Sequence, residues 1–384
     1  MWVILNIHGI KWPRKALPIM SIEANNISRT AHVKICNLAE VPFNYSLPRM
    51  PQTYAIQAKW VRDMYVQDAQ ARRERVTREL ESETGSEILS FDWTVDAAKR
   101  CGRPFLFNAM SSDRSILLSI LTRTSAPFEI VSAVEGLKRR GANPKVVYVD
   151  DHCCGAWPSL LQKIWPGVAV RLDAMHAVRR LTQTTSSTRH PWHAEFCSLL
   201  SSAIYTFDDG EHRRFKTAWR SAGNISDAPK HVEKKYVPRV VANSAHIVSA
   251  IGSVINMYSC KKHADSGELL TPATHRAWDS LRVHVLAGCL CDPLGVQLNT
   301  YGVEESVGGE LFRAINSMRG SSALEGFHTH QKQWLGLLAN HGNEAGAALL
   351  RDGAVRWNRN RRSSVNPVSL DSHWIFDGDV MTDA

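Results

Sequence analysis

The segment Lys145–Asp151, which reads KVVYVDD, decides the fold class. Residues 145–149 are nearly all apolar, which predicts a strand buried on both faces, as in the centre of a parallel sheet. Two acids, Asp150 and Asp151, follow directly. They stand at the carboxyl end of the strand, where open α/β sheets commonly place their functional sites. The segment therefore predicts an α/β domain with polar chemistry at one edge of its sheet.

Three segments before this strand are short, apolar and separated by turn residues, which predicts consecutive antiparallel strands: 88–95, 104–110 and 115–122. A helix is predicted over 127–140, between the third strand and the central one. A short helix over 159–165 and a fifth strand over 168–172 follow. The order β-β-β-α-β-α-β predicts a mixed five-stranded sheet with right-handed crossovers, which is the layout of the ribonuclease H fold.

The rest of the chain divides by composition. Five prolines interrupt the first 51 residues, and the stretch after residue 180 shows no strand signal for roughly 130 residues, which is far longer than an ordinary connection. The expected segments are an irregular lead-in (1–51), a basic amphipathic helical region (52–85), a first part of the catalytic core (86–180), an all-helical insertion (181–316), the last core helices (317–358) and a basic flexible tail (359–384).

Composition restricts the class of protein. The chain has 384 residues and a formal net charge of +9, which favours a polyanionic partner. Its 12 Trp and 44% hydrophobic residues argue against a mainly disordered chain, and no apolar run approaches the ~20 residues needed to span a bilayer. The eight cysteines are too sparse for a disulfide framework, and with no secretory signal they favour a reducing compartment. Cys289-Leu290-Cys291 is a candidate zinc half-site, weighed against two reduced thiols.

Carboxylates occur where a ribonuclease H-like site needs them. Asp92 lies inside the first predicted strand, where a charge is costly unless a partner or metal compensates it. Glu325 stands in the first turn of the helix that follows the insertion. The first and fourth strands are neighbours in this fold, so Asp92 should approach Asp150, which as the first residue past its strand is preferred over Asp151. Such a set can hold two divalent cations for phosphodiester chemistry, and oxygen ligands suit Mg²⁺ or Mn²⁺.

Each acid also has a structural alternative. Asp92 is compatible with a strand-edge carboxylate paired with Lys99 or Arg100. Acids that follow a strand, as at 150 and 151, are common turn residues. The run Ser322-Ala-Leu-Glu325 matches a capping box, in which both side chains satisfy free backbone donors at a helix start. Only the combination favours a catalytic site.

A second element follows the fifth strand. Asp173-Ala-Met-His176 places an acid and a histidine three residues apart, with Arg179 and Arg180 on the next turn. Such a histidine can orient a carboxylate or contact a phosphate, although a lone histidine is more often structural.

These residues carry a resemblance. The segments VVYVDDHCCGAW (146–157), RLDAMHAVRR (171–180) and SALEGFHTHQKQWLGLLANHG (322–342) resemble eukaryotic cut-and-paste DDE transposases of the hAT, Mutator-like, P-element and Kolobok-like group. The resemblance covers roughly residues 86–360. It departs from that group in residues 1–85, where Cys36 alone cannot build the usual N-terminal zinc-binding DNA-recognition module.

The resemblance implies Mg²⁺-dependent (or Mn²⁺-dependent) DNA strand cleavage and strand transfer. It implies Asp92, Asp150 and Glu325 as the catalytic, metal-binding triad. Asp151, Asp173 and His176 are the accessory residues. It also implies DNA partners (transposon ends and target), a homo-oligomer, no membrane, and the nucleus. Basic residues expected on phosphates are Arg139, Arg140, Arg179, Arg180, Arg359, Arg361 and Arg362. The alternatives are a catalytically inactive nucleic-acid-binding protein and a ribonuclease H-like nuclease with another substrate.

Overall fold

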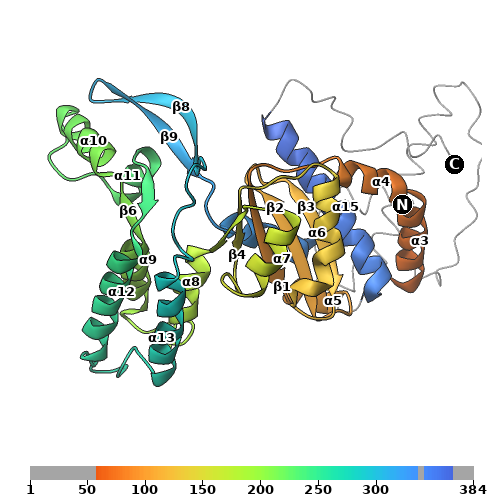
Figure 1. Cartoon of the computed structure of the whole chain (residues 1–384), viewed down its shortest axis with the longest axis horizontal. Helices are drawn as coiled ribbons and strands as arrows, with labels where there is room; N and C mark the ends of the chain where they lie inside the picture. Colours follow the sequence, from red (N-terminus) through yellow and green to blue (C-terminus); the bar gives the residue numbers. More distant parts are fainter. Residues whose placement is uncertain (1–57, 336–340, 366–384) are drawn as a thin grey trace, which may run out of the picture. The chain divides into compact units, whose positions relative to one another are not determined.

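The computed structural model describes residues 58–335 and 341–365, in two compact units (Figure 1). One unit holds Glu79–Val95 and Pro104–His330. The other holds the described residues before 79, residues 96–103, and the described residues from 331 on. The predicted lead-in at 1–51 lies outside the described residues. Among the described residues, no helix combines the length and the apolar character that crossing a bilayer requires.

The larger unit is built on a five-stranded sheet. Its strands are β1 (Ile88–Thr94), β2 (Phe105–Ser111), β3 (Ile116–Thr122), β4 (Val146–Val149) and β5 (Ala169–Leu172). The spatial order is β3-β2-β1-β4-β5, in which β1, β2 and β3 pair antiparallel while β4 pairs parallel with both β1 and β5. All four residues of β4 are buried. The mixed ribonuclease H-like sheet and its central parallel strand are therefore confirmed.

Side-chain alternation gives β1 two different faces. Phe91 points toward the helices α6 (Val131–Arg139) and α7 (Ala156–Ile164), and its ring lies 5.3 Å from that of Phe107 and 5.5 Å from that of Trp157. Successive residues of a strand point to opposite faces, so Ser90 and Asp92 project from the other side. The apolar face holds the core, and the polar face carries the site described below.

The insertion is mainly helical. Four helices pack together around one apolar core: α8 (Ala174–Thr182), α9 (His193–Ile204), α12 (Ser244–Ser259) and α13 (Pro272–Leu286). Two further helices, α10 (Asp209–Ser221) and α11 (Lys230–Tyr236), form a small second core with Phe312.

The expectation of an all-helical insertion is wrong, because the insertion also contains two two-stranded sheets. One pairs β6 (Tyr205–Phe207) with β7 (Arg239–Val241), and the other pairs β8 (Asn299–Val307) with β9 (Glu310–Ser317). The second is the long hairpin at the top of Figure 1. Most residues of its strands are exposed, and neither strand has the continuous apolar run of a core strand. The turn Gly308-Gly309 has φ values of 58° and 85°, which is the geometry that favours glycine pairs in hairpins.

The smaller unit contains α3 (Ala58–Ala71), α5 (Asp96–Arg100) and α15 (Gly342–Val365), and α4 (Arg73–Glu81) begins in it. The amphipathic helical region predicted over 52–85 is, from residue 58 on, two helices that meet at Arg72. The Arg72 guanidinium lies 3.1 Å from the Asp352 carboxylate, and Tyr65 donates a 2.9 Å hydrogen bond to the same group, which holds α3 against α15. Residues 359–365, predicted as the start of a flexible tail, form the last turns of α15, while 366–384 lie outside the described residues.

Candidate metal centre

Asp92 is the most buried acid of the predicted triad. It lies on β1 opposite Asn108 of β2 and is 2% exposed. One carboxylate oxygen accepts a 2.7 Å hydrogen bond from the Trp93 backbone N–H. Burial, with added repulsion from Asp150 and Glu325, raises the pKa of Asp92 from 3.8 to about 9. Asp92 therefore holds a proton at neutral pH unless a cation takes the proton's place.

Asp150 faces Asp92, and Asp151 does not. Asp150 is the first residue after β4, its carboxyl is within hydrogen-bonding reach of the Asp92 carboxyl, and burial raises its pKa. The Asp151 carboxylate is 57% exposed and accepts hydrogen bonds from the His152 N–H (2.6 Å) and from Arg180 (3.3 Å). Of the two predicted candidates, Asp150 is the one placed to share a cation with Asp92.

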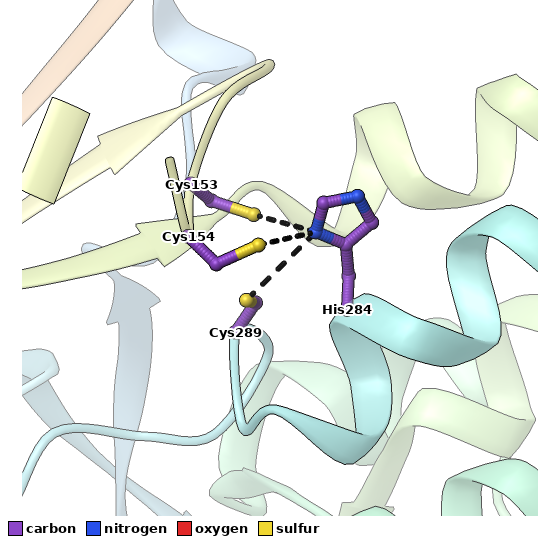
Figure 2. Close-up of side chains that lie close together, drawn as sticks. All are labelled: Cys153, Cys154, His284 and Cys289. Carbon is purple, nitrogen blue, oxygen red and sulfur yellow. Dashed lines mark hydrogen bonds between the residues drawn. The ribbon is translucent and has the colours of Figure 1, made fainter. Parts of the chain in front are cut away.

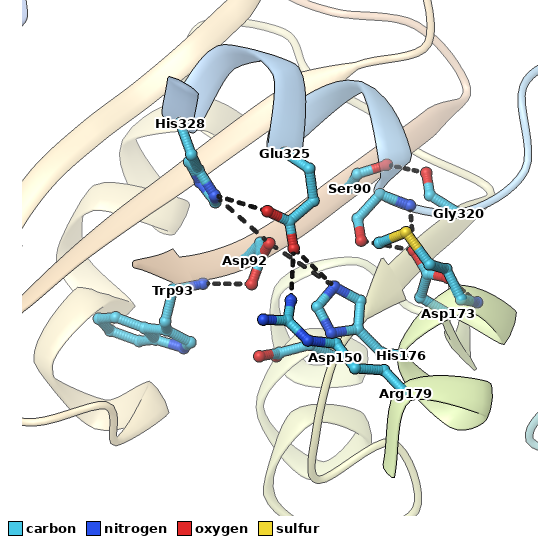
Figure 3. A network of polar contacts seen from close by, with 12 residues as sticks. Ser90, Asp92, Trp93, Asp150, Asp173, His176, Arg179, Gly320, Glu325 and His328 are labelled. Carbon is cyan, nitrogen blue, oxygen red and sulfur yellow. Dashed lines mark hydrogen bonds and ion pairs between the residues drawn. The ribbon is translucent and has the colours of Figure 1, made fainter. Parts of the chain in front are cut away.

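Glu325 points from the first turns of α14 (Ser322–Trp334) into the same site (Figure 3). Its carboxylate accepts a 3.0 Å hydrogen bond from Arg179 and lies 3.8 Å from His176 Nε2. The capping-box alternative is wrong in register, because Ser322 is already the first helical residue.

His176 stands between two of the acids. Its Nε2 is buried, has no hydrogen-bond partner, and lies 3.8 Å from the carboxylates of both Asp92 and Glu325. One ligand atom from each of these three side chains falls within 4.8 Å of the others, close enough for one cation. The predicted accessory histidine is thus brought together with two members of the predicted triad, Asp92 and Glu325.

His328 belongs to the site and was missed from the sequence. Its ring is 5% exposed, and Nδ1 lies 3.8 Å from the Asp92 carboxylate and 3.9 Å from the Glu325 carboxylate. The signal was the spacing Glu325-x-x-His328, because residues three apart on a helix share a face.

Asp173 positions the site rather than entering it. Its carboxylate caps α8 by accepting a 2.5 Å hydrogen bond from Met175 N–H, and it also accepts hydrogen bonds from the backbone and side chain of Ser321. Ser90 of β1 donates a 2.7 Å hydrogen bond to the carbonyl of Gly320. Gly320 has φ of 76°, and a Cβ there would meet the Asp173 carboxylate at 3.0 Å. These contacts fix the start of α14, and with it the position of Glu325.

The predicted phosphate-contacting arginines have different settings. Arg179, half-exposed, pairs with Glu325, and Arg180 donates a 2.6 Å hydrogen bond to the Asp150 carbonyl, so both border the site. Arg140 is partly buried and donates to the Leu117 carbonyl, while Arg139 is exposed at the end of α6. The remaining three lie in the last turns of α15, in the other unit: Arg359, Arg361 and Arg362.

The donor set fits a divalent cation. One ligand atom each from Asp92, Glu325 and His176 lies within reach of a single cation, and the buried His176 Nε2 lacks a hydrogen-bond partner. The third predicted carboxyl, that of Asp150, lies beside Asp92. Carboxylate oxygens are the ligands that Mg²⁺ and Mn²⁺ prefer.

No protein-family model matches this chain, and no curated protein sequence matches it significantly. The geometry of the site is therefore the basis for assigning a function.

Proposed function

We propose that this chain is a transposase-like polynucleotidyl transferase that cleaves DNA and joins DNA strands with Mg²⁺ or Mn²⁺. The observation that carries the proposal is that Asp92 on β1 and Glu325 at the start of α14 lie with His176 within reach of one cation. Asp150, at the end of β4, lies beside Asp92. In this proposal the partners are DNA ends and target DNA, a homo-oligomer is the working form, and the nucleus is the place of action.

The residues have separable tasks in this reaction. Bound divalent cations supply an activated attacking oxygen and stabilise the leaving oxygen in phosphodiester chemistry. Asp92 and Asp150 hold the cation from adjacent parallel strands, and Glu325 approaches from the helix above them. His176 and His328 orient these carboxylates from within 4 Å. Arg179, half-exposed beside Glu325, is placed to contact a phosphate of the strand being cut.

A metal-dependent nicking assay tests this function. Supercoiled plasmid and a labelled duplex would be incubated with the full chain in Mg²⁺, Mn²⁺ or EDTA. We expect nicking and strand joining in either cation and none in EDTA. Asp92→Asn and Glu325→Gln should lower the rate by at least about 100-fold, since each removes a charged ligand from the site. Asp151→Asn is the matched control and should keep the wild-type rate.

The outcomes separate the alternatives. Nicking that survives Asp92→Asn would refute the proposed site. Duplex binding that weakens steeply with salt, without any cation-dependent nicking, would indicate an inactive nucleic-acid-binding protein. Preferential cutting of an RNA–DNA hybrid would indicate a ribonuclease H-like nuclease instead.

A further inference from the structure

A second cluster of metal-binding side chains lies apart from the acidic site. Three sulfur atoms converge on one nitrogen, His284 Nδ1, at 3.1 Å from Cys154, 3.3 Å from Cys153 and 4.0 Å from Cys289 (Figure 2). One ligand atom from each of the four side chains lies within 4.8 Å of all the others. The four belong to the same compact unit.

Hydrogen bonding alone does not explain this arrangement. A neutral imidazole nitrogen either donates one hydrogen or accepts one through its single lone pair. His284 Nδ1 can therefore bond only one of its three sulfur neighbours, and the remaining thiols can pair only with one another. A cation at the centre would give all four atoms a partner.

The spacing agrees with tetrahedral zinc. With Zn–S bonds of ~2.3 Å and Zn–N bonds of ~2.05 Å, a tetrahedron places sulfur and nitrogen about 3.6 Å apart. The three observed separations, 3.1, 3.3 and 4.0 Å, bracket this value. Three cysteines and one histidine are also a usual ligand set of structural zinc sites. We propose that these four side chains bind one structural Zn²⁺ ion.

The four side chains come from two short segments of the chain, two from each. His284 is in the last turn of α13, which ends at Leu286, and Gly288 follows the Ala287 C-cap with φ of 74°. The Cys289 N–H then donates a 3.0 Å hydrogen bond to the His284 carbonyl, which brings both side chains to the same end of the helix. The Cys289 carbonyl accepts a 2.8 Å hydrogen bond from Leu172 N–H at the end of β5. Cys153 and Cys154 come from the loop after β4.

The zinc ion would therefore join the insertion to the sheet. It ties the end of α13 to the loop that begins with Asp150. Cys291, the other half of the motif expected from the sequence, lies outside the cluster, with its sulfur 3.4 Å from the Ser244 hydroxyl. Of that motif, Cys289 belongs to the cluster and Cys291 does not.

Metal content tests the proposal without any activity measurement. The full chain would be purified from zinc-supplemented cells, passed through gel filtration, and assayed for zinc per chain by mass spectrometry. We expect one zinc per wild-type chain and at least about a tenfold loss in Cys289→Ser and His284→Ala. Cys291→Ser, two residues from a ligand, is the matched control and should retain its zinc.

A cobalt measurement on the wild-type protein still tests the proposal if a variant fails to fold. Wild-type protein loaded with Co²⁺ should show thiolate-to-cobalt charge-transfer absorption and the visible bands of a tetrahedral site, and both should weaken in Cys154→Ser, which changes an exposed ligand. Asp92→Asn should leave zinc content and cobalt absorption unchanged, which separates this site from the acidic one. Wild-type protein with neither bound zinc nor thiolate–cobalt absorption would overturn the proposal, as would zinc lost only when the acidic site is changed.

Discussion

Replacing Asp92 with asparagine should remove a pH dependence of stability from the metal-free protein. The pKa of Asp92 is raised from 3.8 to about 9, first by burial and then by Asp150 and Glu325. Between about pH 4 and pH 9 the native state therefore holds a proton that the unfolded chain has released. Since the unfolded state binds fewer protons in this window, the free energy of unfolding falls as pH rises. Asparagine cannot ionise, so Asp92→Asn should lose the part of this decline that Asp92 contributes, while Asp150, whose pKa burial also raises, keeps its own part.

The size of the effect follows from one proton. The contribution of Asp92 is fully favourable below about pH 4, declines by at most ~1.4 kcal/mol per pH unit, and levels off above about pH 9. Urea unfolding in EDTA, followed by tryptophan fluorescence at several pH values from 5 to 9, measures the slope. We expect the free energy of unfolding of the wild type to fall steadily relative to that of Asp92→Asn as pH rises across this range. Added Mg²⁺ should recover stability at high pH, by about 2.7 kcal/mol at 100 times its dissociation constant.

Asp96 offers a control of the same chemistry and opposite sign. A hydrogen bond from Lys332 lowers the pKa of Asp96, so its contribution is present above about pH 4 and is lost only as pH falls below that. Asp96→Asn should therefore give a curve parallel to wild type from pH 5 to 9. Parallel curves for wild type and Asp92→Asn would refute the assignment of a buried, proton-holding Asp92.

Three further substitutions test the packing and the site. Asp173→Ala should lower the free energy of unfolding by about 2–5 kcal/mol in urea titrations, because it removes a helix cap and leaves the buried Ser321 N–H without its acceptor; a loss under about 1 kcal/mol would contradict this. His328→Gln should weaken Mn²⁺ binding about 10–100-fold by calorimetry, and unchanged affinity would place His328 outside the centre. Gly353→Ala should destabilise the protein by about 1–3 kcal/mol, because the new Cβ would stand 2.1 Å from the Trp334 ring; an unchanged thermal midpoint would contradict this packing.

The sheet was predictable because its signals are local. The apolar run before Asp150 and the three turn-separated strands before it are each encoded within a few residues, and their order alone restricts the topology. The hairpin over 299–317 was not predicted because its strands are mostly exposed and neither has a continuous apolar run, so Gly308-Gly309 was its clearest sequence signal. The local sequence pattern thus predicts buried strands better than exposed ones.

The acidic residues of the candidate site could be predicted from the sequence, but the contacts that hold them in place could not. The approach of Asp92 to Asp150 follows from strand order, because the first and fourth strands are neighbours in this fold. Glu325 was predicted from its place in the first turn of the helix after the insertion. The contact between Asp173 and Ser321 joins residues 148 positions apart, and no periodicity encodes it. His328 could have been found from its helical spacing with Glu325, once that helix was placed against β1.

One loop serves both proposed metal sites, and this couples them. Asp150 is the first residue of the loop, and its carbonyl accepts a 2.6 Å hydrogen bond from Arg180. Cys153 and Cys154 follow in the same loop, three and four residues later. If zinc fixes the far end of the loop, losing zinc should loosen Asp150 and weaken Mn²⁺ binding at the acidic centre. The coupling should run through Asp150 alone. His284→Ala should therefore weaken Mn²⁺ binding in the wild-type background and have little further effect in Asp150→Asn, as a double-mutant cycle by calorimetry would measure. Equal weakening in both backgrounds would mean that zinc loss acts on the whole unit rather than on this loop.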